Sequence, residues 1–383
     1  MKSGQKSPSS TVFIFTAGPK AGTSTFCPSC YADCRKSAKT DAEGAFDIES
    51  LDPQLLFRIL VVAKGYKPQF VAKVDPASGP ILVELEPIES NEITPDRSVR
   101  GQVVGPNGKP IVGAVVEFEG IRRKNDAGAT WGSVPGVDPL AVTDEQGEFQ
   151  LTAREPFQSL DVQVEAGTYA NRQFANLTSG SSFHKLTLTE GATVQGRVLL
   201  NGKPLPFVEV GIVSVDRTVG NFTGNFSIGT DKDGRFAFVN VPPNVDYFIY
   251  GIMNTLKQHG AVPPRKIRVG ADGSTTDAGD LVVEPAVRLA GQVVCSDGEP
   301  IPPDTRLLIS REDAWDSMQL ELDQAGRFDT GGLARGAISL SVRIPGYQVS
   351  QKNLSLDSFN PFQLVGRIAD DITNLVFLLD KGS

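Results

Sequence analysis

The sequence predicts an all-β protein made of four tandem β-sandwich domains in an extended array. Three observations predict this fold class. Glycine and proline, 39 and 26 of the 383 residues, are scattered between short apolar runs, as is typical of short strands joined by tight turns. Three sequence markers recur along the chain, and such recurrence indicates repeated domains. Each repeat closes with alternating apolar and polar residues, the pattern of a half-buried strand.

The first marker is a Gly-x-Val strand followed by a turn and then by proline and an aliphatic residue. Its glycines, Gly101, Gly196 and Gly291, are 95 residues apart at both steps. The turns contain Asn-Gly or Asp-Gly, which tolerate the positive φ angles of tight turns. We therefore expect this marker, at residues 101–111, 196–205 and 291–301, to open the later three repeats, with its strands at residues 101–104, 196–200 and 291–295.

The second marker, Asp-x-x-Gly-x-Phe, occurs four times. We expect the aspartate to cap the backbone of a turn and the glycine to adopt a left-handed conformation. The phenylalanine should then begin an inward-facing strand. The four copies are residues 41–46, 144–149, 231–236 and 323–328.

The third marker is an aliphatic strand that runs into glycine and tyrosine, and a closing strand follows it. This marker occupies residues 61–66, 164–169 and 342–347, and it is degenerate at 248–252. The closing strands are predicted at residues 81–85, 184–188, 280–283 and 374–379.

These markers place the four domains at residues 1–88, 98–190, 191–285 and 286–383. Each domain has about seven short strands, which fits a two-sheet sandwich of immunoglobulin-like size. An acidic linker that contains Pro95 joins the first two domains, whereas almost no residues separate the later ones. We therefore expect a fairly stiff array.

The Gly-x-Val opening and the Thr-Asp-x-x-Gly-x-Phe hairpin resemble the carboxypeptidase regulatory-like domain, over nearly the whole chain. The resemblance implies Greek-key sandwiches of transthyretin-like or starch-binding-like fold, often found as tandem units in secreted or surface proteins. It says little about function, because one fold hosts many activities. The zinc carboxypeptidase His-x-x-Glu signature is absent, since Thr187 and Val262 follow His184 and His259 at that spacing.

The first repeat has the Asp-x-x-Gly-x-Phe hairpin but no Gly-x-Val opening. Residues 11–15 correspond to a second strand, as residues 114–118 do in the second repeat. We infer that an edge strand is missing, which would expose unpaired backbone N–H and C=O groups. Either the chain is a fragment that begins after this strand, or the open edge accepts a strand from a partner. Fusing the missing strand should stabilise the first domain.

The formal net charge is −8, and this acidic balance argues against nucleic acid as a partner. No apolar run approaches the roughly 20 residues of a membrane-spanning helix. Residues 1–10 are polar and residues 11–15 are too short for a signal-peptide core, so the chain as given carries no signal peptide. The compartment stays open: the resemblance implies an extracytoplasmic or cell-surface location, whereas the missing signal fits the cytoplasm.

Three cysteines, Cys27, Cys30 and Cys34, lie close together in the long loop of the first domain. They either form a local disulfide, which leaves one odd thiol, or provide ligands to a structural zinc ion. A zinc site needs a fourth ligand, from Asp33, another loop or another chain. A redox Cys-x-x-Cys pair normally begins a helix, and no such context is visible. Cys295 falls in an opening strand and is expected to be a small core residue.

The loop between the second and third strands varies in length and contains an aromatic residue in each repeat. If the domains share one fold, these loops lie at the same end of each sandwich, where they can form a site for a protein or polysaccharide ligand. The alternative is that each ring folds back over its own core. The candidate ligand-binding residues are Tyr31, Trp131, Phe222, Phe226 and Trp315.

No nucleophile, general base or complete metal set can be named from the sequence. The first hypothesis is therefore a non-catalytic binding, adhesive or spacer module of a larger secreted or cell-surface protein. The alternative is a carbohydrate-binding module that uses the loop aromatics, and an enzyme is the third hypothesis. No cofactor is expected apart from the zinc ion considered above.

Overall fold

The computed structural model describes residues 10–20, 33, 36–88, 93–123, 128–218, 220–223, 226–350, 352, 358–360 and 363–382. These residues form strands and turns, with one four-residue helix, α1 (Met253–Leu256), and two 3-10 turns, η1 (Pro76–Ser78) and η2 (Pro95–Arg97). The all-β prediction is confirmed. No helix in the described part of the chain has the length and apolar character needed to cross a membrane.

The chain divides into two compact units, Met1–Gly167 with Phe174–Leu188, and Thr168–Gln173 with Thr189–Ser383. Each unit contains most of two consecutive predicted domains. We keep the names first to fourth domain for the four predicted segments. Whether each segment folds independently stays a prediction.

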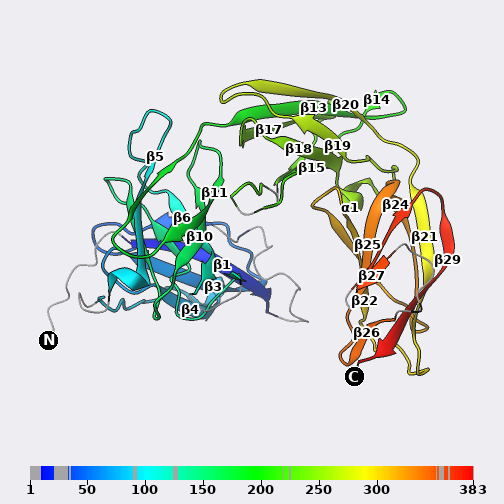
Figure 1. Cartoon of the computed structure of the whole chain (residues 1–383), viewed down its shortest axis with the longest axis horizontal. Coiled ribbons are helices and arrows are strands. Elements are labelled where there is room, and N and C mark those ends of the chain that lie inside the picture. The colour runs from blue at the N-terminus through cyan, green and yellow to red at the C-terminus, as the bar shows by residue number, and fades with distance from the viewer. Residues whose placement is uncertain are drawn as a thin grey trace. The chain divides into compact units, whose positions relative to one another are not determined.

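The third domain shows the sandwich most clearly. Its strands are β13 (Ala192–Leu200), β14 (Lys203–Pro204), β15 (Glu209–Ser214), β16 (Phe226–Gly229), β17 (Arg235–Val241), β18 (Asp246–Gly251), β19 (Arg265–Arg268) and β20 (Thr275–Val282). In one sheet β13 is central, with β17 antiparallel on one side and β20 parallel on the other (Figure 1). The other sheet has the order β16-β15-β18-β19. The opening and closing strands are thus direct neighbours.

The fourth domain repeats this topology. Its strands are β21 (Val287–Cys295), β22 (Arg306–Arg311), β23 (Ser317–Glu321), β24 (Arg327–Leu333), β25 (Gly336–Val342), β26 (Tyr347–Val349), β27 (Ser358–Asn360), β28 (Gln363–Ile368) and β29 (Ile372–Lys381). The opening strand β21 lies between β24, antiparallel, and β29, parallel. The facing sheet has the order β23-β22-β25-β28-β27.

The second domain also repeats it. Its strands are β5 (Ser98–Val104), β6 (Val115–Arg122), β7 (Thr130–Trp131), β8 (Leu140–Val142), β9 (Glu148–Thr152), β10 (Ser159–Glu165), β11 (Arg172–Thr178) and β12 (Phe183–Thr187). The opening strand β5 lies between β9 and β12, and the facing sheet has the order β11-β10-β6-β7, with β8 also on β6. The predicted class of tandem β-sandwich domains is confirmed.

The opening glycines lie at the most crowded point of these sheets. Each pairs with the phenylalanine of its own turn marker: Gly101 with Phe149, Gly196 with Phe236, and Gly291 with Phe328. A Cβ added to these glycines, in the same order, would come within 2.3, 2.7 and 2.1 Å of a carbonyl oxygen of the closing strand. Glycine is therefore required because the closing strand approaches too closely for any side chain.

The Asp-x-x-Gly-x-Phe turn has the predicted local structure in all four repeats. One carboxylate oxygen of the aspartate accepts hydrogen bonds from the backbone N–H groups two and four residues later, at 2.8–3.0 Å. The glycine has a φ between 69° and 84°. In the later three domains the phenylalanine then enters a strand, as predicted, and is buried.

The first domain differs, because the structure describes one complete sheet in it. Its strands are β1 (Ser10–Pro19), β2 (Ser37–Lys39), β3 (Leu55–Ala63) and β4 (Gln69–Val74), in the order β2-β1-β3-β4. This order matches the β16-β15-β18-β19 sheet of the third domain, so β1 takes the position of a second strand, as predicted. Phe46 begins no strand, and the closing strand predicted at residues 81–85 is not formed.

The sequence predicted that the strand missing from the first domain is an edge strand. That position is wrong, because the opening strand is central in the sheet. In the later three domains the opening strand is central and pairs with a neighbour on both sides. A domain without it therefore has two segments, not one, with no strand to pair with. Among the described residues of the first domain no such strand is present, and neither of the two segments forms a strand.

Candidate functional site

The first domain contains two segments whose backbone has no hydrogen-bond partner in the part of the chain that the structure describes. We call these the open segments: residues 46–49, after the Asp-x-x-Gly turn, and residues 80–85, at the predicted closing strand. Among the described residues, none of their backbone N–H and C=O groups has a hydrogen-bond partner. Their side chains alternate between partly buried and exposed, as in a half-buried strand. The side chains that pack on the core are Phe46, Ile48, Ile81, Val83 and Leu85.

These core-facing side chains are less buried than their counterparts in the other domains. Phe46 is partly exposed, whereas the equivalent phenylalanines of β9, β17 and β24 are 4–5% exposed. Val83 is likewise partly exposed, whereas the closing strands of the other domains each contain core residues that are at most 6% exposed: Leu186 in β12, Ala278 and Leu281 in β20, and Leu375, Phe377 and Leu379 in β29. The central strand that covers these positions in the other domains accounts for the difference.

The opposite face of the first domain's sheet packs on the second domain, within the same compact unit. Phe13 and Leu60 form a buried cluster with Leu140 of β8. Val12 and Ile14, which alternate with Phe13 along β1, face the core of their own domain. Both faces of β1 are thus covered, which explains its continuous apolar run.

A buried ion pair lies between the third and fourth domains, within the second unit. Arg311, at the end of β22, and Asp316 have side chains that are each 4% exposed, and Arg311 Nη2 lies 2.7 Å from Asp316 Oδ2. Arg311 also donates to the carbonyl oxygens of Gly251 and Val262 in the third domain, at 2.5 and 3.1 Å. The backbone N–H of Met253 donates to Asp316 at 2.9 Å. Each of the two domains therefore donates hydrogen bonds to the other.

Apolar contacts surround this ion pair, and we call the whole set of contacts the joint. Met253 of α1 is 2% exposed and belongs to the hydrophobic core of the fourth domain. The Arg311 guanidinium lies 5.3 Å from the centre of the Tyr250 ring, and burial raises the pKa of Tyr250 to about 12. Phe222 and Trp315 meet edge to face, with ring centres 5.0 Å apart. A buried arginine among aromatic rings is typical of the centre of a stable interface.

Sequence reasoning missed the joint. Arg311 ends β22 and Asp316 directly precedes β23, so both lie at the loop between the second and third strands of the fourth domain, which the sequence predicted only to be variable in length and to contain an aromatic residue. An arginine and an aspartate five residues apart usually belong to a solvated surface. Their burial depends on a neighbouring domain, and no local pattern reveals that.

The structure describes the side chains of three of the five candidate ligand-binding aromatics. Phe222 and Trp315 contact each other across the joint, so neither ring simply covers the core of its own domain. Trp131, in β7, is 49% exposed and Trp315 is 47% exposed. Tyr31 and the side chain of Phe226 lie outside the described residues. Ligand binding by these aromatics stays a prediction.

The possible metal site also falls largely outside the described residues, as do its three cysteines, Cys27, Cys30 and Cys34. Asp33, considered as a fourth ligand, accepts a hydrogen bond from the backbone N–H of Asp52 at 2.9 Å and pairs with Lys36 at 2.5 Å. The Lys36 contact, followed by that of Asp52, lowers the pKa of Asp33. A metal ion at Asp33 would have to replace Lys36. The described residues contain no cluster of three or more potential metal ligands.

Cys295 and the two histidines lie where the sequence placed them. Cys295 is buried in the core of the fourth domain, and burial raises the pKa of its thiol. His184 belongs to β12 and its Nε2 lies 2.9 Å from the carbonyl oxygen of Thr178. His259 lies in the loop after α1.

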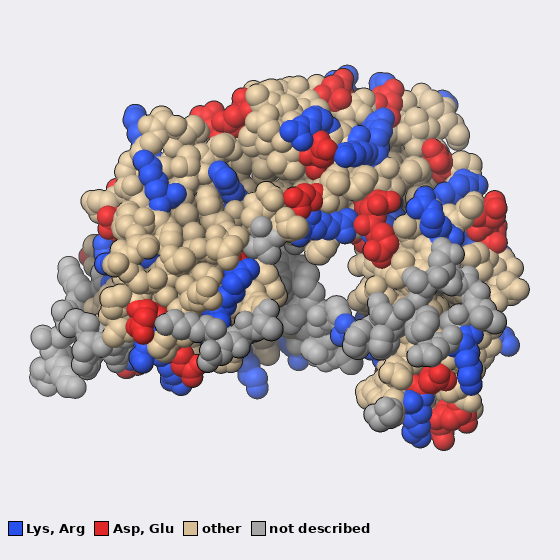
Figure 2. Space-filling view, viewed as in Figure 1, with Lys and Arg blue, Asp and Glu red and all other residues tan. Residues whose placement is uncertain are grey.

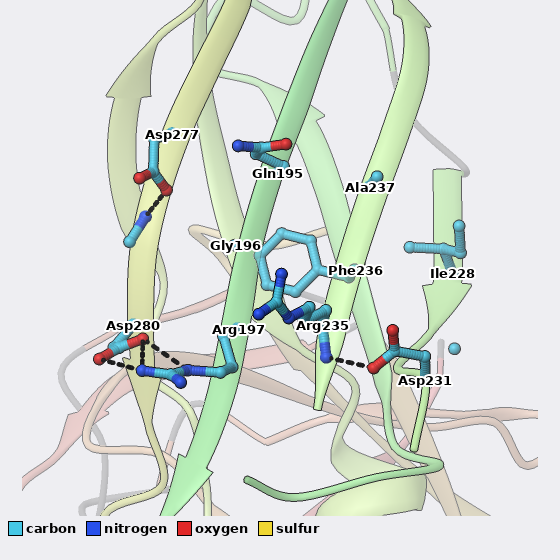
Figure 3. Close-up of a pocket in the computed structure, with 12 residues that line it drawn as sticks. Gln195, Gly196, Arg197, Ile228, Asp231, Arg235, Phe236, Ala237, Asp277 and Asp280 are labelled. Atoms are coloured by element: carbon cyan, nitrogen blue, oxygen red, sulfur yellow. Dashed lines mark hydrogen bonds and ion pairs between the residues drawn. The ribbon is translucent and has the colours of Figure 1, made fainter. Parts of the chain in front are cut away.

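A pocket of about 530 Å³ opens on the third domain, where β13 lies beside β17 and β20 (Figure 3). Most of its charged side chains have hydrogen-bond partners. Arg197 binds the two carboxylate oxygens of Asp280 at 3.1 and 3.2 Å. Asp231 caps its turn by accepting from the backbone N–H of Arg235, and Asp277 accepts from the backbone N–H of Gly279. The carboxylates of the lining thus belong to turn caps and to a surface ion pair.

Charged side chains of both signs are interspersed on the surface. On the face shown in Figure 2, lysines and arginines lie in scattered groups among aspartates, glutamates and uncharged residues. This agrees with the modest net charge of −8. That face carries no extended basic surface of the kind that binds nucleic acid.

Comparisons with known proteins give no family. No protein-family model matches the chain, and no curated protein matches it. Solved structures with some similarity include the Bacillus anthracis TIE protein, at 12% identity and a TM-score of 0.22, covering 98% of this chain and 69% of that one. A streptococcal ancillary pilin has 12% identity and a TM-score of 0.25, covering 74% of this chain and 98% of that one. The minor pilin GBS52 of Streptococcus agalactiae has 15% identity and a TM-score of 0.25, with 50% and 97% covered.

TM-scores this low assign neither a family nor a function to the chain. Membership of the carboxypeptidase regulatory-like family therefore stays a prediction, based on the sequence markers alone.

Proposed function

We propose that the chain is a non-catalytic adhesive or spacer module of a larger secreted or cell-surface protein. The joint is the observation that carries the proposal. A spacer must hold consecutive domains in a constant orientation, and relative motion is the default for domains that share only a small interface. At the joint, Met253 enters the core of the next domain while Arg311 and Asp316 make directional hydrogen bonds.

The sequence markers support the surface context. The Gly-x-Val opening and the Asp-x-x-Gly-x-Phe turn resemble a domain family whose tandem units are often parts of secreted or surface proteins. The adhesive and spacer roles are compatible, because a rigid row of domains also positions a binding surface.

Distance measurements between spin labels within the second unit test the spacer proposal. Labels on cysteines introduced at Val239 and Val376, which are 66% and 50% exposed, would report on the third and fourth domains. The native cysteines would be replaced by serine. We expect one narrow distance distribution for the parent chain and a broad one for Arg311→Met. Arg306→Met is the matched control, because Arg306 starts the same strand but pairs with the exposed Glu321.

A broad distribution in the parent chain would contradict the proposal. So would an Arg311→Met distribution as narrow as that of the control, because the joint would then not hold the orientation.

Carbohydrate binding is a second candidate, favoured by the half-exposed rings of Trp131 and Trp315. Pull-down on a panel of polysaccharides separates it from the first proposal. Retention that is lost in Trp131→Ala or Trp315→Ala would support a glycan site. No retention on any glycan would leave the adhesive or spacer role.

A further inference from the structure

We propose that the second, third and fourth domains are built to carry tension along the chain. Each of them pairs its opening strand in parallel with its closing strand. A pull on the two ends of such a domain must slide one strand along the other. This inference goes beyond the spacer role, because resistance to force is a property of each domain and does not depend on the joint.

The three parallel strand pairs are the observation that carries the inference. The pairs β5 with β12, β13 with β20, and β21 with β29 contain five, six and six paired residues on each strand. In Figure 1, β13 lies beside β20 and β21 lies beside β29. The chain enters each pair at the start of the opening strand and leaves it at the end of the closing strand. Because the two strands run in the same direction, entry and exit lie at opposite ends of the pair.

The direction of the pull decides how the backbone hydrogen bonds between the two strands break. In a parallel pair these bonds are evenly spaced along both strands. A pull along the strands stresses all of them at once, so they must break together. A pull across the strands at one end breaks them one after another, which requires less force. Forced unfolding is governed by the rate of unfolding, so this geometry adds resistance that equilibrium stability does not measure.

Further backbone hydrogen bonds extend the strand pair of the third domain at both ends. At the entry end, the N–H of Thr193 donates to the carbonyl oxygen of Ser274 at 2.8 Å. At the exit end, the N–H of Val283 donates to the carbonyl oxygen of Leu199, also at 2.8 Å. These are the positions where a pull on the domain first acts, so the pair is secured where the stress enters.

The opening glycines allow the two strands of each pair to lie this close. A Cβ added to Gly101, Gly196 or Gly291 would come within 2.3, 2.7 or 2.1 Å of a carbonyl oxygen of the closing strand. A side chain at this position would push the closing strand away from the opening strand. The same glycine in three domains therefore preserves the contact that a pull along the chain would stress.

Pulling on the third domain within the full chain, with DNA handles in an optical trap, tests this inference. Handles on Glu190→Cys and Glu284→Cys, which flank β13 and β20, pull along the strand pair. Handles on Lys203→Cys and Val282→Cys, which lie at the same end of the two strands, pull across it. All four residues are exposed. We expect a higher unfolding force with the first pair of handles at every loading rate.

Urea unfolding of the two double-cysteine chains separates the direction of the pull from stability. Their transition midpoints should agree, because exposed substitutions away from special features change stability little. Cys295 is buried and stays in place. The other native cysteines would be replaced by serine in both chains.

The fourth domain provides an independent repeat of the test. Handles on Glu284→Cys and Lys381→Cys pull along β21 and β29, whereas handles on Glu299→Cys and Lys381→Cys pull across them. These three residues are also exposed. This domain decides the question if a substitution in the third domain shifts its urea midpoint.

Equal forces in the two directions would overturn the inference, and so would a higher force across the strands. Neither pair of handles in the third domain stretches the joint. The result is therefore independent of the label distances that test the spacer role, and either proposal can fail while the other stands.

Discussion

Replacing Arg311 by methionine should uncouple the third and fourth domains. Methionine keeps much of the side-chain length but removes the charge and every donor. The change would break three hydrogen bonds, to Gly251, Val262 and Asp316. The Asp316 carboxylate, 4% exposed, would keep the backbone N–H of Met253 as its partner from the third domain.

The size of the expected loss of stability follows from the burial of the Asp316 carboxylate. Removing one partner of a buried ion pair costs about 3–5 kcal/mol, because the other charge stays buried without compensation. For a unit of this size, each kcal/mol lowers the melting temperature by roughly 2–4 °C, so the loss should be about 6–20 °C. Arg311 Nε has no partner among the described residues, so the wild-type pair already bears one unsatisfied donor and the lower half of the range is expected.

Urea unfolding of the full chain is the assay, followed by tryptophan fluorescence and by circular dichroism. Trp315 lies at the joint and should report its loss. We expect the second unit to unfold in one transition in the parent chain and in two in Arg311→Met. The double variant Arg311→Met with Asp316→Leu should recover part of the loss, since no charge is then left buried.

Arg306→Met is the control variant for this prediction. Arg306 pairs with Glu321 at 51% and 80% side-chain exposure, and pairs so exposed contribute only about 0–1 kcal/mol. If Arg311→Met lowered stability no more than Arg306→Met does, the joint would not hold the domains together.

Three further predictions concern single residues. Gly291→Ala should destabilise the fourth domain by about 1–3 kcal/mol in urea unfolding, because its Cβ would meet the Leu375 carbonyl oxygen. Cys295 should react with a thiol reagent only after denaturation, because it is buried and its pKa is raised; fast reaction in the native chain would contradict its place in the core. Burial raises the pKa of Tyr250 to about 12, against about 10 in the unfolded chain. Its contribution to stability is therefore complete below pH 10 and is lost as the pH rises toward 12, and alkaline unfolding should be less steep in Tyr250→Phe.

The turn markers could be predicted from sequence because their structure is local. An aspartate that accepts two backbone hydrogen bonds and a glycine with positive φ need no other part of the chain. All four Asp-x-x-Gly-x-Phe turns have the expected geometry, including the one in the incomplete first domain. The alternation of apolar and polar residues likewise predicted which side chains face a core, even at residues 80–85, where no strand forms.

Which strands lie next to each other in a sheet could not be predicted in the same way. Periodicity gives the faces of a strand but not its place in a sheet, so the opening strand was taken for an edge when it is central. The glycines of the first marker carried the missing information. A glycine at the same place in three opening strands indicates that a neighbouring strand lies too close for a side chain. Such crowding is expected for a central strand and less for an edge strand.

The joint and the open segments result from one property of this fold. Each sandwich builds one of its sheets around a strand from the very start of the domain, so the closing strand returns to pair beside it. A domain with its opening strand is closed, and it can contact the next domain only through loops and side chains, as Arg311 and Met253 do. In the first domain the described residues include no such strand, and the two segments that would flank it, residues 46–49 and 80–85, form no strand and leave the core partly covered.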